Sequence, residues 1–168
     1  MAQINRPEKP RTSTFLPAGH DHIQCQRQAL RAAEQQCQLD KVRLTPLRRE
    51  VLELIWQNHR PVKAYDLLDR LKVNHPGAVP TTVYRALDFL LEHELVHRLQ
   101  SLNAFIGCGT PGDQHRGQFL ICRRCGTVAE LQNTDLHQQI SEQAARLGFQ
   151  VDNETIEIFG ACADCQRN

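Results

Sequence analysis

The sequence predicts an α+β protein built from two modules, a mostly helical one followed by a smaller one of strands and a helix. In the first module, apolar residues recur every three or four positions, which is typical of amphipathic helices. In the second, turn residues separate short apolar runs, and both Cys-x-x-Cys pairs of the chain lie there. With 168 residues, 40% of them apolar, the chain is long enough for one ordinary domain or two small ones.

The composition argues against a membrane protein, because no run approaches the roughly 20 consecutive apolar residues that a span needs. The N-terminus lacks the apolar core of a secretory signal, so we expect a cytoplasmic protein with no membrane partner. In that reducing compartment, the seven cysteines are more often metal ligands or buried apolar groups than disulfides.

The net charge is only +1, but the charges are unevenly distributed. Residues 41–100 carry ten basic and seven acidic side chains, whereas residues 101–168 carry five basic and eight acidic ones. This asymmetry suggests modules with different partners.

The chain opens with a polar segment, residues 1–22, whose lack of an apolar period predicts a disordered arm. His20 and His22 could contact a metal, although a solvated tail is the favoured interpretation. A helix is expected from Gln24 to Asp40. The next helix has clear start signals, since Thr45 can cap it and Pro46 fits its first position. Its buried face is formed by Leu47, Val51, Leu54 and Ile55.

A shorter helix within residues 63–78 ends at a His-Pro-Gly break, and a third begins within VPTTVYRALDFLLEHE, residues 79–94. Thr81 or Thr82 can cap this helix, and its polar face shows Tyr84, Arg85 and Asp88 to solvent. A hairpin over residues 95–100 and 103–108 follows. Three helices and a hairpin are the order of a winged helix-turn-helix, whose third helix enters the major groove of DNA.

The second module is expected to hold strands over 118–122, 127–131 and 155–160 and a helix over 134–147. The inward-facing residues of that helix are predicted to be Leu136, Ile140 and Leu147. A glycine-rich stretch marks a hinge. The predicted domains are an arm (1–22), a winged-helix domain (23–106), a hinge (107–116) and an α+β domain (117–168).

Two Cys-x-x-Cys pairs, 36 residues apart, predict a structural zinc site in the second module, because four thiolates complete a tetrahedron. They are Cys122, Cys125, Cys162 and Cys165. The alternatives are a redox dithiol and a rubredoxin-like iron centre. A thioredoxin-type pair opens a helix, whereas the first pair here lies between strands, which favours zinc.

A second set of metal-ligating residues surrounds the hinge: His97, Cys108, His115 and Glu130. Two imidazoles, one thiolate and one carboxylate can make a four-coordinate site, and the sulfur favours zinc over iron or manganese. Each residue also has an ordinary structural explanation, as a strand, core or loop residue.

Six segments together resemble the ferric uptake regulator family of metal-sensing repressors, from about Cys37 to Cys165. They are VRLTPLRREVL, AYDLLDRL, PTTVYRALDFLLE, VHR, CRRCG and CADC. The resemblance, closest to the zinc-sensing branch, implies an N-terminal winged helix-turn-helix domain followed by a C-terminal α/β dimerisation domain with structural zinc. It also implies that the four cysteines of the two pairs bind structural zinc and that His97, Cys108, His115 and Glu130 bind regulatory zinc, giving two Zn²⁺ per chain.

Iron-sensing members of the family carry a histidine-rich run near the position of His115, where this chain has the single histidine of GDQHRG. This difference favours zinc sensing over the iron- and peroxide-responsive branches, which remain the alternatives within the family.

The resemblance also implies DNA-contacting residues. Tyr65 and Arg85 match residues that approach bases, with Tyr84 beside them, and an arginine suits a bidentate contact with guanine. Phosphates would be held by Thr81, Thr82 and Arg49. Asp69 and Lys72 match an acid–base pair through which two dimers can share one operator, although lysine lacks the planar fork of arginine.

The function that follows from the resemblance is a zinc-dependent repressor of zinc uptake genes, which binds operator DNA as a homodimer and is not an enzyme. Two other classes compete with it. A zinc enzyme would need an open coordination position at the His97 site, which four protein ligands do not leave. A zinc-stabilised interaction module that never touches DNA would not depend on Arg85.

Overall fold

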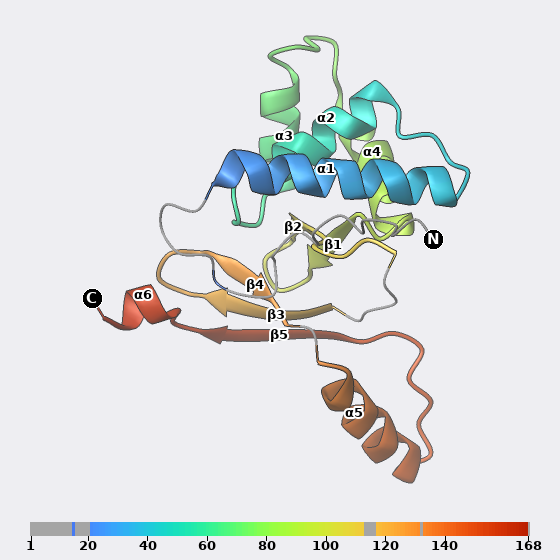
Figure 1. The fold of residues 1–168 in the computed structure, drawn as a ribbon, viewed down its shortest axis with the longest axis vertical. Helices are drawn as coiled ribbons and strands as arrows, with labels where there is room; N and C mark the ends of the chain where they lie inside the picture. The colour runs from blue at the N-terminus through green and yellow to red at the C-terminus, as the bar shows by residue number, and fades with distance from the viewer. Residues whose placement is uncertain (1–14, 16–20, 113–116, 132, 168) are drawn as a thin grey trace, which may run out of the picture.

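The computed structural model describes Phe15, residues 21–112, 117–131 and 133–167. Its elements form successive layers: helices at one end, then a two-stranded hairpin, a three-stranded sheet, and a single helix at the other end (Figure 1). The helices are α1 (His22–Leu39), α2 (Pro46–Ile55), α3 (Ala64–Leu71), α4 (Pro80–Glu92), α5 (Thr134–Arg146) and α6 (Ala163–Gln166). The strands are β1 (Val96–Leu99), β2 (Ala104–Gly107), β3 (Gly117–Cys122), β4 (Val128–Glu130) and β5 (Thr155–Gly160).

The long helix α1 begins two residues earlier than predicted, because Asp21 caps it by accepting a hydrogen bond from the Gln24 N–H at 3.0 Å. His22 therefore lies in the helix. The buried stripe of α1 packs against α2 and consists of Cys25, Ala29, Leu30, Ala33 and Cys37.

The winged-helix core is formed by α2, α3 and α4, as the sequence predicted. Thr45 and Pro46 start α2 as expected. The prediction that Thr81 or Thr82 caps α4 was wrong. The helix starts at Pro80, whose missing N–H costs nothing at the first position, and Val79 is the capping residue. Instead, Thr82 Oγ1 accepts a hydrogen bond from the Val79 N–H at 3.2 Å.

The hairpin of β1 and β2 joins as predicted, with His97 opposite Ile106. A bridge from Val62 to Phe105 attaches it to the helices. Gly107 is required for close packing, since a Cβ atom there would lie 2.2 Å from the Trp56 ring.

The three-stranded sheet has the order β4-β3-β5, with β3 antiparallel to β4 and parallel to β5. The parallel pair places Cys122 opposite Gly160, so both Cys-x-x-Cys pairs emerge at one end of the sheet. The described residues contain no helix long and apolar enough to cross a membrane.

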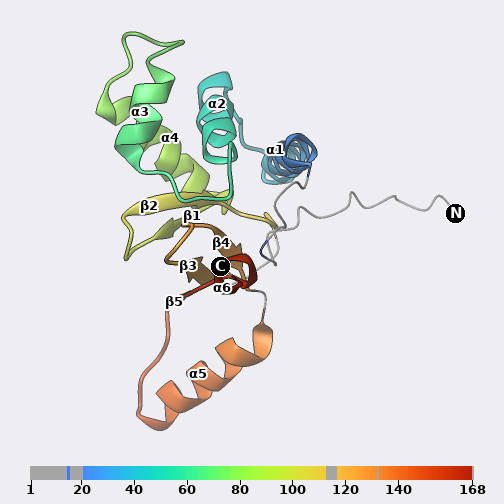
Figure 2. The ribbon, with the colours of Figure 1, turned by 90° about the vertical axis from the view of Figure 1, so that its left-hand side faces the viewer.

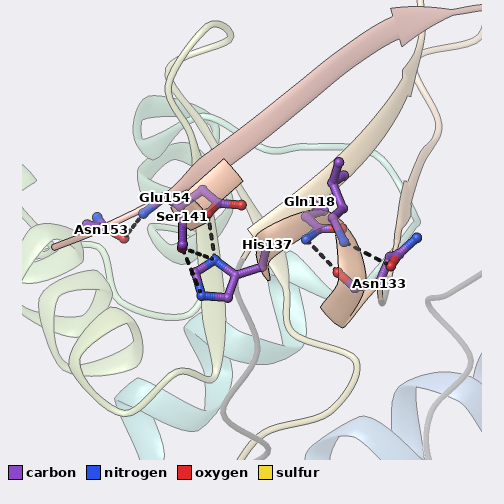
Figure 3. A network of polar contacts seen from close by, with 7 residues as sticks. Gln118, Asn133, His137, Ser141, Asn153 and Glu154 are labelled. Atoms are coloured by element: carbon purple, nitrogen blue, oxygen red, sulfur yellow. Dashed lines mark hydrogen bonds and ion pairs between the residues drawn. The ribbon is translucent and has the colours of Figure 1, made fainter. Parts of the chain in front are cut away.

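Helix α5 lies below the sheet in both views (Figures 1 and 2), and polar contacts connect it to the rest of the domain (Figure 3). His137 Nδ1 lies 2.7 Å from Glu154 Oε2, and the Gln118 amide donates to the Asn133 carbonyl at 3.0 Å. The prediction that Leu147 faces inward was wrong, because it caps the helix C-terminus and is 86% exposed. Within one chain, no described element covers it.

Candidate functional site

The four cysteines of the two Cys-x-x-Cys pairs converge at the end of the β3–β5 pair. Their sulfur atoms all lie within 4.8 Å of one another, and Cys125 Sγ is 3.7 Å from Cys162 Sγ. The first pair sits in a tight turn that Gly126 completes with a φ of 74°, a conformation that favours glycine. The second pair follows β5 and opens α6, a short helix that sequence analysis did not predict.

The environment of these thiols suits a cation. Backbone hydrogen bonds from Cys125 and Cys162 lower the pKa of Cys122 to about 6, and the Cys162 N–H lies 3.3 Å from Cys122 Sγ. The neighbouring sulfurs raise the pKa of Cys165 to about 12, with Cys162 the largest contributor. Four thiols this close cannot all ionise alone, but a divalent cation compensates their charge, so the donor set fits zinc.

A second cluster lies between the hairpin and the three-stranded sheet. His97 comes from β1, Cys108 follows β2 and Glu130 ends β4, and their ligand atoms lie within 4.8 Å of one another. Cys108 and Glu130 are 1% and 3% exposed, respectively. The Glu130 carboxylate accepts a hydrogen bond from the Gly109 N–H at 3.3 Å. A half-buried imidazole brought together with a buried thiol and a buried carboxylate fits the chemistry of a zinc site.

The pKa of His97 reflects the charged groups around it in this cluster. Burial alone would lower its pKa, but hydrogen bonds and charges from Cys108 and Glu130 outweigh burial and raise the pKa to about 9. A buried carboxylate requires a positive partner, and here that partner is the imidazolium or a metal ion. The predicted fourth ligand, His115, lies outside the described residues.

Of the predicted DNA-contacting residues, Thr81, Thr82 and Arg85 line one groove, and both tyrosines are exposed. Tyr65 on α3 is 68% exposed and Tyr84 on α4 is 45% exposed, and Arg85 is exposed beside it. An open groove of about 220 Å³ runs between the starts of α2 and α4. Its lining consists of Thr45, Leu47, Arg48, Thr81, Thr82, Arg85 and Ala86.

Arg49 does not line this groove. Its guanidinium pairs with Glu34 of α1 at 2.9 Å and with Glu53 one turn along α2. Arg48 lines the groove instead. It is held over the Phe89 ring at 3.7 Å and donates to the Arg43 carbonyl at 2.9 Å. Sequence reasoning missed Arg48 because two adjacent arginines on a helix cannot be told apart without knowing which faces α4.

Asp69 and Lys72 lie near the end of α3, and both are exposed. Figure 1 shows α3 at the outer end of the helical layer.

Comparison with known proteins agrees with this geometry. The sequence profile of the ferric uptake regulator family matches residues 40–159. The zinc uptake regulation protein of Escherichia coli K12 is 44% identical over 138 residues, which span 81% of this chain and 80% of that protein.

Solved structures give the same result. A zinc uptake regulator complexed with zinc and DNA superposes with a TM-score of 0.80 at 40% identity, covering 84% of this chain and 95% of that one. Holo XcZur superposes with a TM-score of 0.76 at 45% identity, covering 83% and 97%. The chain belongs to the ferric uptake regulator family.

Proposed function

We propose that the protein is a zinc-responsive transcriptional repressor, which binds operator DNA as a homodimer when loaded with zinc and represses zinc uptake genes. The names of its relatives support this function: one is a zinc uptake regulation protein, and another was solved with zinc and DNA. Because the proposed partner is operator DNA, we expect the protein to act in the cytoplasm as a regulator and not as an enzyme.

The observation that carries the proposal is the convergence of His97, Cys108 and Glu130. His97 belongs to the wing hairpin, Cys108 follows the hairpin directly, and Glu130 belongs to the sheet of the following domain. A zinc ion on these residues, with His115 as the proposed fourth ligand, would supply the positive charge that binds hairpin and sheet together. In its absence, the His97–Glu130 ion pair, at 3.1 Å, still joins hairpin and sheet at this cluster. In the zinc-loaded form, the DNA-binding helices would be held more firmly relative to the second domain than in the zinc-free form. The affinity for DNA would therefore depend on zinc.

We propose that Cys122, Cys125, Cys162 and Cys165 hold a second, structural zinc ion, giving two per chain. A site that joins the end of β3 to the C-terminal segment after β5 stabilises this domain at the end of the parallel pair where both strands finish.

On the DNA side, we propose that Arg85 reads a guanine, with Tyr65 and Tyr84 nearby, and that Thr81 and Thr82 hold phosphates. The groove between α2 and α4 adds Arg48 as a phosphate contact. Arg49 pairs with two carboxylates, so its proposed phosphate contact requires that those pairs break when DNA binds.

The dimer interface is proposed to lie on the second domain. Leu147, Phe149 and Ile158 are 86%, 65% and 45% exposed, respectively, which leaves apolar surface around α5 and β5 without a cover from the described chain. Asp69 and Lys72 are proposed to join two dimers on one operator.

The decisive experiment selects duplexes from a random DNA pool with the full chain and Zn²⁺, and then measures binding of the enriched duplex at several free zinc concentrations. We expect a single enriched motif with two-fold symmetry and at least tenfold loss of affinity with chelator. Enrichment that is equal with and without zinc, or no enrichment, contradicts the proposal. Iron(II) replacing zinc at lower free concentration would indicate an iron-responsive regulator instead.

A further inference from the structure

The turn of the wing hairpin is joined to the three-stranded sheet by a carboxylate that belongs to neither cysteine cluster. The Gln100 N–H donates to Glu157 Oε1 at 2.6 Å, and the Ser101 N–H donates to Glu157 Oε2 at 3.3 Å. The Ser101 hydroxyl donates to the same Oε2. Glu157 lies on β5, so both oxygens of one side chain in the second domain accept hydrogen bonds from the turn of the first.

The strand register places Glu157 on the same face of the sheet as Glu130. Phe119 of β3 is paired with Glu130 of β4 on one side and with Glu157 of β5 on the other. Residues paired directly across neighbouring strands point to the same face. The hairpin lies above the sheet in both views (Figures 1 and 2). The two carboxylates therefore flank one row, and each contacts a different part of the hairpin: Glu130 contacts His97, and Glu157 contacts the turn.

Between these two carboxylates, the contact of hairpin and sheet is apolar. The His97 and Phe119 rings meet edge to face with centroids 5.2 Å apart. One buried cluster joins residues of the hairpin to residues of the sheet: Leu99, Ile106, Phe119, Ile121 and Val128. Apolar burial has no directional preference, whereas hydrogen bonds do. The contacts of Glu157 therefore fix where the turn rests on the sheet, and they need no metal ion.

The strength of this contact suits an adjustable junction. Hydrogen bonds to an ionised acceptor are stronger than those between neutral groups. Glu157 is only half-buried, however, and Gln100 and Ser101 are exposed, so water competes for the same groups. The contact is strong enough to shift an equilibrium between a closed and an open junction, but too weak to lock it.

We propose that Glu157 is a positioning residue for the zinc site of His97, Cys108 and Glu130. By holding the turn on the sheet without a metal, it keeps His97 close to Glu130 before zinc binds. A site that is already closed has a higher apparent affinity, because none of the binding free energy is used to close it. The inference rests on the proposed regulatory zinc site, whose occupancy it adjusts. Because such coupling is reciprocal, bound zinc strengthens the hold of Glu157 on the turn.

The first arm of the test measures the contact itself by amide hydrogen exchange, followed by NMR on the full chain after mild chelator. We expect the Gln100 and Ser101 amide protons of this zinc-depleted protein to exchange several-fold more slowly than those of Glu157→Ala. Equal exchange rates in the two proteins would mean that the contact does not form without zinc, and they overturn the proposal.

The second arm measures the free Zn²⁺ concentration at half-occupancy of the chelator-exchangeable site, by competition with a zinc-binding dye and without DNA. Glu157→Ala should raise this concentration by about three- to tenfold. Glu157→Gln, which keeps one acceptor oxygen, should give an intermediate value. Arg98→Ala is the matched control, because the Arg98 guanidinium donates to Asn103 Oδ1 at 3.0 Å, a contact within the hairpin. It should keep the wild-type value.

An unchanged half-occupancy concentration in Glu157→Ala overturns the proposal, and so does an equal rise in Arg98→Ala, which would reflect a general loosening of the hairpin. If Glu157→Ala also loses the zinc that resists chelator, its second domain has not folded, and Ser101→Ala decides instead. That variant changes only the hairpin and should raise the concentration about twofold, and no rise overturns the proposal. A wild type without exchangeable zinc would contradict the proposed function, whereas normal exchange with no effect of Glu157 contradicts this inference alone.

Discussion

His97 Nε2 lies 3.1 Å from Glu130 Oε1, although the two residues belong to different sheets. This pair is one point at which the wing hairpin and the second domain contact each other, and another is the Glu157 carboxylate, which accepts hydrogen bonds from the Gln100 and Ser101 N–H groups. Cys108 lies within ligand distance of both, so the three residues form one unit whose charge is balanced by a proton on His97 or by a metal ion.

The first prediction concerns Cys108→Ser. Serine replaces the sulfur with a weaker zinc ligand in the same space, so we expect zinc per chain to fall by one, while the zinc that resists mild chelator stays bound. Elemental analysis before and after chelator measures both quantities. Cys37→Ser, also buried but not part of this cluster, should match the wild type. A Cys108→Ser variant that binds as much zinc per chain as the wild type, and loses as much of it to chelator, would contradict the proposed regulatory site.

The second prediction separates Arg85 from Arg48. Loss of a bidentate guanine contact in Arg85→Ala should reduce discrimination against a changed base pair by about 1–3 kcal/mol, or roughly 5- to 150-fold. Arg48→Ala should instead weaken binding to all DNA sequences alike. It should also reduce the slope of log affinity against log salt concentration by about the value of one phosphate contact. Fluorescence anisotropy at several salt concentrations, with the selected duplex and a mismatched one, distinguishes the two. A uniform loss in Arg85→Ala would make it a phosphate contact.

Local sequence predicts many of the helices and strands, and the predictions that were wrong or incomplete have physical reasons. Residues 155–160 form the predicted strand because alternation and flanking turn residues define it. Leu147 was assigned to the core because periodicity identifies an apolar position without indicating whether the same chain covers it. Arg48 was not predicted as a groove residue, because only the folded chain shows which of two adjacent arginines faces α4. Sequence alone therefore predicts the regular spacing of the Cys-x-x-Cys pairs better than residues that only packing brings together.

The third prediction uses the pH dependence of stability. Hydrogen bonds from Asn74 and His75 lower the pKa of Glu50 below its usual 4.5, so the folded state favours the carboxylate. The resulting stabilisation is present above pH 4.5 and is lost as the pH falls through the folded-state pKa. Urea denaturation should show Glu50→Gln about 1 kcal/mol less stable at pH 7, and nearly equal to the wild type at the acidic end. Glu142→Gln, on an exposed face of α5, is the control. A gap that does not change with pH would exclude the charge of Glu50 as its cause.

The fourth prediction tests the apolar surface of the second domain. Phe149→Ser should raise the dimer dissociation constant at least tenfold, because exposed aromatic residues often dominate an interface. Val73→Ser is the matched control, since Val73 is 80% exposed but lies on the helical domain. Sedimentation velocity over a concentration series measures both. Equal dimer dissociation constants for the two variants would show that Phe149 is not part of the dimer interface.

The fifth prediction concerns the close approach of Gly107 to Trp56. A methyl group at position 107 would lie 2.2 Å from Cε2 and Nε1 of the indole, which is itself 3% exposed and cannot move aside freely. Gly107→Ala should therefore destabilise the protein by about 1–3 kcal/mol, as overpacking does in other cores. Gly160→Ala is the control, because a Cβ atom there meets nothing within 4 Å. Both are measured by urea denaturation, followed by far-UV circular dichroism and by the fluorescence of Trp56, the single tryptophan of the chain. Equal stability of the two variants would mean that the hairpin shifts to admit the methyl group. The junction between the wing and α2 would then be more deformable than its packing indicates, and His97 could change its distance from Glu130 without breaking the core.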